Sequence, residues 1–169
     1  SPNLFLMYRF PKKEELIEQI YQLFQEELAQ ITKDYEVLSD FGEMNLQLRD
    51  FYNFQQRFRF FYLDLLEIER AFPSIAQKHH AHIEGQINGL EKSFIYNVGL
   101  NYLKKYDSPQ IYRHLARQFW MCTVFWLMQL AVRGKEGTID EMTESAWMLV
   151  YPHTTSQGKT DFREIFFVN

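Results

Sequence analysis

The chain has 169 residues and a formal net charge of −4, and 46% of its residues are hydrophobic. This length suits one domain with a substantial core, and so apolar a composition excludes a disordered chain. Residues 1–13 contain Arg9, Lys12 and Lys13 and no acid, so they carry +3 and leave −7 for the rest. The sequence therefore joins a positive end to an acidic body, although an ordinary solvated surface explains the asymmetry equally well.

Cysteine content and hydropathy indicate the cellular compartment. Cys122 is the one cysteine, which excludes an internal disulfide and fits a reducing compartment. The opening apolar run is interrupted at residues 11–13, so no signal peptide is recognisable. The most apolar segment covers residues 119–132, which is short of the roughly 20 residues that cross a bilayer. We expect a soluble, cytoplasmic protein without a membrane partner.

Helical periodicity runs through the sequence and predicts an all-α fold of about six to seven helices. The first helix is expected from Pro11 to about Thr32, because apolar residues recur at spacings of three and four between Leu16 and Ile31. Proline suits the first turn of a helix, and the two glutamates that follow suit the positive end of the helix dipole.

The middle of the chain is expected to form two long helical segments. Asp40 followed by Glu43 indicates a helix start, and the lack of glycine and proline between Gly42 and Pro73 favours one long helix or two nearly collinear ones. The next segment, residues 75–103, contains three glycines, at which we expect a kink or a break.

Three further helices are expected in the last third. One begins at Asp107 or Ser108 and runs to about Arg133, where a glycine follows. The capping box of residues 138–141 starts another, which ends before a proline, and a short last helix begins near Thr160.

Residue patterns that support catalysis or metal binding are weak. His79 and His82 share a helix face and could hold a metal with a third ligand from elsewhere, with His80 beside them. Because the surrounding segment is polar, histidines on the surface or lining a pocket are the favoured interpretation. No phosphate loop, nucleophile elbow or Cys-x-x-Cys motif is present, so the sequence suggests no enzyme, metal or cofactor.

The helix expected at residues 108–133 carries large apolar side chains around its whole circumference. Such a helix must be buried on all sides, and a second copy of the chain could cover its outer face. A central helix enclosed by its own domain is the alternative. We favour a two-fold dimer with a four-helix interface that includes Trp120, Val124, Leu127, Met128, Trp147 and Met148.

The stretch LMYRFPKKEEL at residues 6–16 resembles a junction in TetR-like (TetR/AcrR) transcriptional regulators. There the recognition helix of the helix-turn-helix ends and the fourth helix begins, with the pattern Leu-Tyr-x-His-Phe, two variable residues and Lys-Glu-Glu-Leu. Met7 replaces a frequent tyrosine here, and Arg9 replaces the usual histidine. Residues 59–75 and 149–158 are also similar to one branch of this family, so the resemblance covers nearly the whole chain.

The resemblance implies a TetR-like C-terminal helical bundle. Residues 1–10 would be the end of a DNA-binding helix-turn-helix, and residues 11–169 would form a ligand-binding and dimerisation domain. The first two helices of the DNA-binding domain are not recognisable, so we expect a fragment or an incompletely ordered regulator. Tyr8, Arg9 and Lys13 would contact backbone phosphates of an operator in double-stranded DNA, which gives register and salt-dependent affinity.

The implied function is that of a ligand-responsive repressor that binds DNA as a dimer. A small apolar ligand of unknown identity would move the helix at residues 11–32 and release the DNA. The segment from Arg57 to Arg70 can be a mostly apolar cavity wall or a helix with ion pairs on its wet face. We expect the pocket to be lined by Phe58, Phe61, Tyr62, Leu65, Glu67, Tyr96 and Phe119. The alternative is a helical binding or scaffold domain without a DNA role.

Overall fold

The computed structural model describes residues 11–33 and 39–166, with side chains at positions 15–31 and 39–163. Within these ranges the fold is all-α and contains no β-strand. The elements are α2 (Pro11–Lys33), α3 (Phe41–Arg57), α4 (Arg59–Leu63), α5 (Leu65–Ala71), α6 (Pro73–Gly99), α7 (Gln110–Val124), α8 (Trp126–Val132), α9 (Ile139–Val150), the short 3-10 helix η2 (Tyr151–His153) and α10 (Ser156–Phe166).

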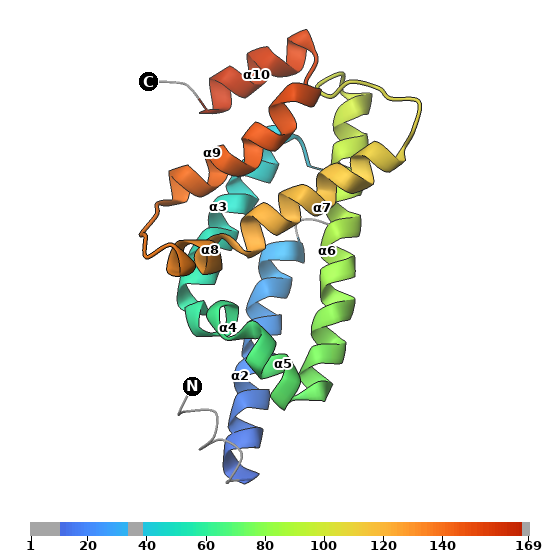
Figure 1. Cartoon of the computed structure of the whole chain (residues 1–169). Coiled ribbons are helices and arrows are strands. Elements are labelled where there is room, and N and C mark those ends of the chain that lie inside the picture. Colours follow the sequence, from blue (N-terminus) through green and yellow to red (C-terminus); the bar gives the residue numbers. More distant parts are fainter. Residues whose placement is uncertain (1–10, 34–38, 167–169) are drawn as a thin grey trace.

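α6, which has 27 residues, is the longest of the described helices and runs along one side of the molecule (Figure 1). α7 packs against α6, and α9 packs against α7 and α3. α2 packs against α3 and extends toward one end of the molecule, while α10 covers the opposite end (Figure 1). The helix that follows the first ten residues therefore lies far from the C-terminal helix.

Local sequence signals set several helix starts. Asp40 accepts a bond from the backbone N–H of Glu43 at 2.9 Å, and the Glu43 carboxylate accepts one from the N–H of Asp40 at 3.0 Å. Thr138 and Glu141 form the same reciprocal capping box at the start of α9. These bonds satisfy N–H groups that a helix leaves free in its first turn, and they confirm the expected starts.

The two longest predicted helices are interrupted. The segment expected to run to Phe72 breaks at Phe58 and at Asp64, where the backbone leaves helical geometry, and this gives α3, α4 and α5. The segment expected to run to Arg133 breaks at Phe125 into α7 and α8. Gln55 is fully buried and donates to the carbonyl oxygens of residues 123 and 124, at 3.0 and 3.2 Å. A side chain from α3 thus satisfies carbonyl groups at the end of α7.

The break expected at the glycines is absent at Gly85 and Gly89, whereas α6 ends at the third glycine, Gly99. α6 is continuous from Pro73 to Gly99 and contains both Gly85 and Gly89. Contacts with α5 and α7 support this helix, so packing outweighs the unfavourable helix propensity of glycine.

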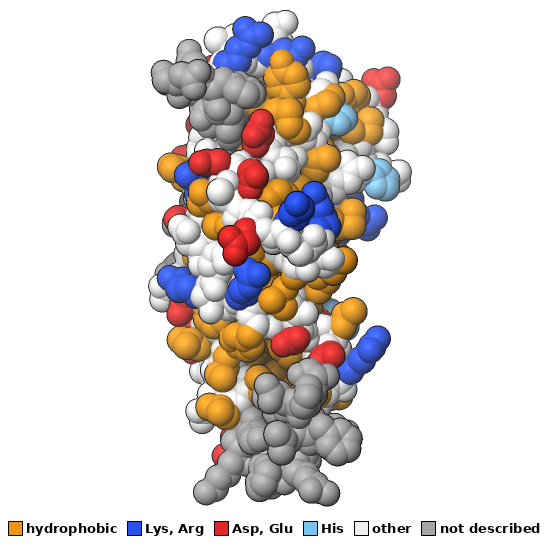
Figure 2. Space-filling view, turned by 60° about the vertical axis from the view of Figure 1, so that its left-hand side comes forward, with side chains coloured by type: hydrophobic (Ala, Val, Ile, Leu, Met, Phe, Trp, Pro, Cys, Tyr) orange, Lys and Arg blue, Asp and Glu red, His pale blue; other side chains and the backbone are white. Residues whose placement is uncertain are grey.

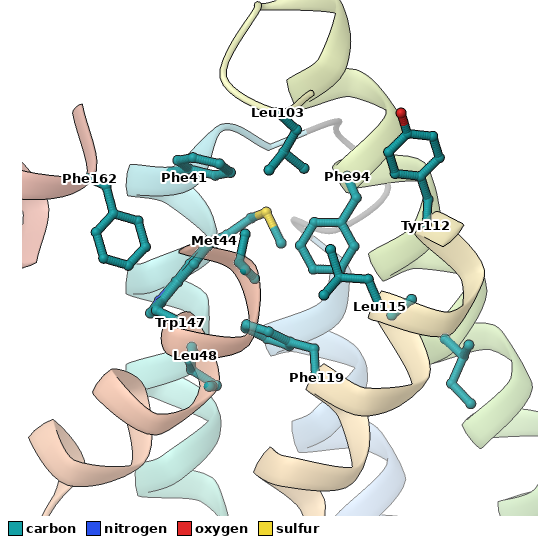
Figure 3. Close-up of a cluster of buried hydrophobic side chains, with 14 of the residues drawn as sticks. Phe41, Met44, Leu48, Phe94, Leu103, Tyr112, Leu115, Phe119, Trp147 and Phe162 are labelled. Atoms are coloured by element: carbon teal, nitrogen blue, oxygen red, sulfur yellow. The ribbon is translucent and has the colours of Figure 1, made fainter. Parts of the chain in front are cut away.

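The hydrophobic core consists of two clusters, which we call proximal and distal according to whether they contain residues of α2. The distal cluster joins α3, α6, α7, α9 and α10, and its rings and aliphatic side chains converge around Phe119 and Trp147 (Figure 3). The proximal cluster joins α2 to α3, α4 and α5, and Phe24 of α2 packs there against Phe61 with ring centroids 4.3 Å apart. Trp120 of α7 contacts both clusters.

Candidate ligand-binding cavity

A cavity of about 390 Å³ lies between α3, α6 and α7. This volume falls in the range of about 300–1,000 Å³ that is usual for small-molecule sites. None of the described residues that line it has a charged side chain. The lining residues are Met44, Leu48, Phe51, Ala81, His82, Gly85, Gln86, Gly89, Leu90, Phe119, Trp120, Thr123 and Val124.

Small residues of α6 form one wall of the cavity. Ala81, Gly85 and Gly89 are spaced four apart, so they lie along one helix face. A Cβ atom added at either glycine would meet nothing within 4 Å. Part of the cavity therefore exists because α6 lacks side chains here. Ala81 and Gly85 are exposed, so the cavity opens to solvent beside them.

Three polar side chains line the cavity, and two of them have partners. The Trp120 indole N–H donates to Gln86 Oε1 at 3.0 Å, and the Thr123 hydroxyl donates to the carbonyl oxygen of Trp120 at 3.0 Å. His82 Nε2 is buried and has no hydrogen-bond partner among the described residues. Burial, and to a smaller extent the neighbouring His79, lowers the pKa of His82, so its imidazole is neutral at pH 7.

The cavity borders the cluster that holds α2. Phe51 and Val124 line the cavity and belong to the proximal cluster, and Trp120 contacts both clusters. One turn of α6 before His82, the His79 ring packs edge-on against Tyr21 and Phe24 of α2, with ring centroids 6.5 and 6.4 Å apart. α6 therefore contacts both the cavity and α2 within a single turn.

His79 is held in place by α5. Its Nδ1 lies 2.8 Å from Glu69 Oε1, and its side chain is only 6% exposed. Burial lowers the pKa of His79, and the hydrogen bond that His79 donates to the Glu69 carboxylate opposes that shift. His80 is exposed and reaches the same carboxylate at 3.4 Å. The three histidines thus have different surroundings: His79 packs against α2, His80 lies on the surface and His82 lines the cavity.

Most of the residues expected to line the pocket lie elsewhere. Phe119 lines the cavity. Glu67 is exposed and Tyr96 is half-buried, and neither lines it. The remaining four pack in the proximal cluster against α2, and they are Phe58, Phe61, Tyr62 and Leu65. The wall on α6 was not predicted, and the spaced glycines of the segment AHIEGQINGL were the available signal.

The residues expected at a dimer interface differ in exposure. Leu127 and Trp147 are fully buried within the single chain and Val124 is 5% exposed, so their side chains do not form an outer surface. Trp120 and Met128 are half-buried, and Met148 is 41% exposed.

Other apolar side chains of α7 and its continuation are more exposed. Met121 is 49% exposed and Phe125 is 37% exposed. Figure 2 brings forward the side on which α9 and α8 lie, and hydrophobic side chains are spread there between charged ones.

The expected phosphate contacts cannot be placed on the structure. Tyr8 and Arg9 lie outside the described residues, and Lys13 lies in α2 with its side chain outside them. In the part of the chain with described side chains, no group of three or more His, Cys, Asp or Glu residues is placed to hold a metal ion. No helix in the described ranges combines the length and the apolar character needed to cross a bilayer.

Comparison with protein families gives a match over most of the chain. The family described as "TetR: Bacterial transcriptional repressor" matches residues 14–162. The chain belongs to the TetR family. A TetR-family transcriptional regulator from Marinobacter aquaeolei VT8 has a similar crystal structure, with a TM-score of 0.76 and 16% sequence identity over 98% of this chain and 82% of that one. No curated protein gives a significant match.

Membership of the TetR family identifies the chain as a transcriptional regulator. Regulators of this family generally act by binding DNA and not by catalysis. The structural likeness at 16% identity shows the all-α fold, and it assigns no ligand or operator.

Proposed function

We propose that this chain is the ligand-binding and dimerisation part of a TetR-family repressor, which binds operator DNA as a dimer and releases it when a small apolar ligand enters the cavity. Residues 1–10 are the end of the recognition helix in this proposal, and residues 11–169 form the regulatory domain. Because the partner is chromosomal DNA, the protein acts in the cytoplasm.

The position of the cavity carries this proposal. The cavity lies where the distal and proximal clusters meet, and the proximal cluster contains Tyr21 and Phe24 of α2. A ligand that contacts Phe51 and Trp120 therefore touches side chains that also pack in the cluster around α2. Allosteric release requires the ligand to bind the DNA-free arrangement more tightly, and a coupling of about 1–3 kcal/mol is usual.

Exposed apolar side chains support the dimer. Met121 on α7 and Met148 on α9 are 49% and 41% exposed, and the two helices pack against each other. Pairing these two helices with their copies across a two-fold axis would bury both side chains in a four-helix interface. The interface proposed here uses the outward faces of α7 and α9, and it leaves the buried Leu127 and Trp147 in the core of each protomer.

Selection of DNA from a random duplex library tests the proposal, with the natural full-length protein as bait. We expect enrichment of a two-fold symmetric site, because a dimer places equivalent recognition helices in successive major grooves. Arg9→Ala should weaken binding to all sequences alike and reduce the salt dependence by about one phosphate contact.

Lys159→Ala is the matched control. Lys159 is exposed on α10, at the far end of the molecule from the start of α2, so its removal should leave DNA affinity unchanged (Figure 1). Failure to enrich any duplex would favour the alternative of a helical scaffold domain without a DNA role.

A further inference from the structure

We propose that His79 and Glu69 form an acid-sensitive contact that holds α2, so that a proton added to the buried His79 imidazole loosens α2 from the rest of the domain. The effect on α2 follows from the contacts of the described residues. Its consequence, that mild acid weakens DNA binding, rests on the proposed function, in which α2 follows directly on the recognition helix.

The His79 ring is enclosed by aromatic rings from two other helices. Its plane is nearly perpendicular to the ring of Phe61 on α4, with centroids 5.4 Å apart, and it packs in the same way against Tyr21 and Phe24 of α2. The side chain is only 6% exposed. A positive charge on this ring therefore loses most of its hydration, which is unfavourable unless a counter-charge lies nearby.

A single carboxylate provides that counter-charge. His79 Nδ1 lies 2.8 Å from Glu69 Oε1, and the Glu69 side chain is itself only 16% exposed. The other oxygen of this carboxylate lies 3.4 Å from Nε2 of the exposed His80. Glu69 thus shares its negative charge between two histidines, which limits how far it compensates a proton on His79.

Other titratable groups around His79 do not favour its protonation. On α2, burial raises the pKa of Tyr21 to about 12, so its hydroxyl carries no charge in mild acid. The neighbour on α4 is Phe61, which does not titrate. On α6, His80 and His82 lie close enough that a positive charge on either one disfavours a proton on His79.

The remaining charged groups near this contact are exposed. Glu15 and Glu18 of α2 and Lys78 of α6 line a surface groove to which Tyr21 also contributes. Water screens such exposed charges, and the two signs partly cancel. Glu69 is therefore the main favourable charge for a protonated His79.

Protonation of His79 is consequently linked to loss of the contact. Burial, the largest influence, lowers the pKa of His79 below its ordinary value of 6.5, and Glu69 opposes this shift without reversing it. The detached ring thus binds a proton more readily than the packed ring. By linkage, the contact stabilises the fold fully above pH 6.5, and this stabilisation is lost as the pH falls through the pKa of the packed His79.

Hydrogen exchange of α2 in the absence of DNA tests the inference. The full-length protein is labelled at pH 7.5 and at pH 5.5, with labelling times scaled for the intrinsic pH dependence of exchange. The protection of residues 15–31 is then expressed relative to that of α7, which corrects for any general loss of stability. We expect this relative protection in the wild type to be about three- to tenfold lower at pH 5.5.

Two matched variants assign the effect to His79. His79→Gln keeps an N–H donor for Glu69 but takes up no proton in this range, so its relative protection should be equal at both pH values. His80→Gln makes the same change at the exposed histidine on the same carboxylate and should retain the pH dependence of the wild type.

NMR titration of the wild type gives a second readout that needs no substitution. The amide shifts of α2 should follow the same titration curve as the His79 ring, with a midpoint below 6.5. The affinity for operator DNA should fall between pH 7.5 and pH 5.5 about three- to tenfold more in the wild type and in His80→Gln than in His79→Gln.

The outcomes separate this inference from the proposed function. Equal protection of α2 at both pH values in the wild type, an acid-induced loss that persists in His79→Gln, or α2 amides that titrate with another midpoint would overturn the acid-sensitive contact. Opening of α2 without a change in operator affinity would overturn its regulatory role. A protein that binds no operator but loses α2 protection through His79 would contradict the proposed function and support the contact.

Discussion

Gln55 illustrates how one buried side chain allows a helix to be interrupted. Its amide N–H₂ donates to the carbonyl oxygens of Thr123 and Val124, which lie at the end of α7 next to the break at Phe125. Buried carbonyl groups without a donor are costly, so the interruption depends on a polar residue from α3.

Replacing Gln55 by leucine should therefore destabilise the fold. We expect Gln55→Leu to lower the free energy of unfolding by about 1–3 kcal/mol, because two buried carbonyl groups lose their donor. Urea denaturation followed by circular dichroism measures this change. Asn53→Leu on the exposed face of the same helix is the control and should have little effect. An equal loss in both variants would show that the hydrogen bonds do not stabilise the break.

At the scale of elements, α10 is attached through the segment that connects it to α9. Thr155 N–H donates to the carbonyl oxygen of Tyr102 at 3.0 Å, and its hydroxyl accepts from the N–H of Gly158 at 3.0 Å. Gly158 is buried, and a Cβ atom there would overlap the carbonyl group of Tyr102. Close approach between backbones explains why glycine occupies this position in the first turn of α10.

Two glycine-to-alanine substitutions should have opposite effects. Gly158→Ala should lower the free energy of unfolding by about 1–3 kcal/mol, because the added methyl group forces α10 away from Tyr102. Gly85→Ala, in a helix position where the methyl group meets nothing within 4 Å, should raise it by up to about 1 kcal/mol. Thermal denaturation of both variants checks this, and a stabilising Gly158→Ala would contradict the proposed packing of α10.

Helix starts could be predicted from the sequence, whereas interruptions could not. Asp40 and Thr138 have side chains that cap a helix locally, so the relevant interactions lie within four residues. The breaks at Phe58 and Phe125 have no glycine or proline signal. The second break depends on Gln55, which is 68 residues from Thr123 in sequence, and such a distant contact is invisible to local patterns.

At the candidate site, likewise, the sequence shows an apolar helix face but not what that face contacts. The aromatic residues between Phe58 and Leu65 form an apolar face, but sequence alone does not show whether that face meets a cavity or another helix. The structure packs it against Phe24 and its neighbours on α2. The cavity instead follows from side chains that are missing at Gly85 and Gly89, and an absent side chain has no hydrophobic pattern to detect.

For the whole molecule, the proposed dimer depends on outward-facing methionines. We expect the double variant Met121→Glu, Met148→Glu to be monomeric under conditions in which the wild type is a dimer, because burying four carboxylates across a two-fold interface is unfavourable. Native mass spectrometry measures the assembly directly.

Ile95→Glu provides the control for that experiment. Ile95 is 46% exposed on α6, so the substitution adds a similar charge to a similarly exposed site on another helix. This variant should remain a dimer. Equal dissociation of both proteins, or a monomeric wild type, would contradict the interface on α7 and α9.

The proposed function requires a ligand in the cavity to change DNA binding, and fluorescence anisotropy of labelled operator DNA measures that change. Full-length wild-type protein and Gly89→Leu are bound to the selected operator and titrated with β-naphthol, a small aromatic probe. We expect the wild type to release the DNA and Gly89→Leu, whose cavity is filled, to stay bound. Equal release from both proteins, or no release from wild type at concentrations that saturate the cavity, would contradict it.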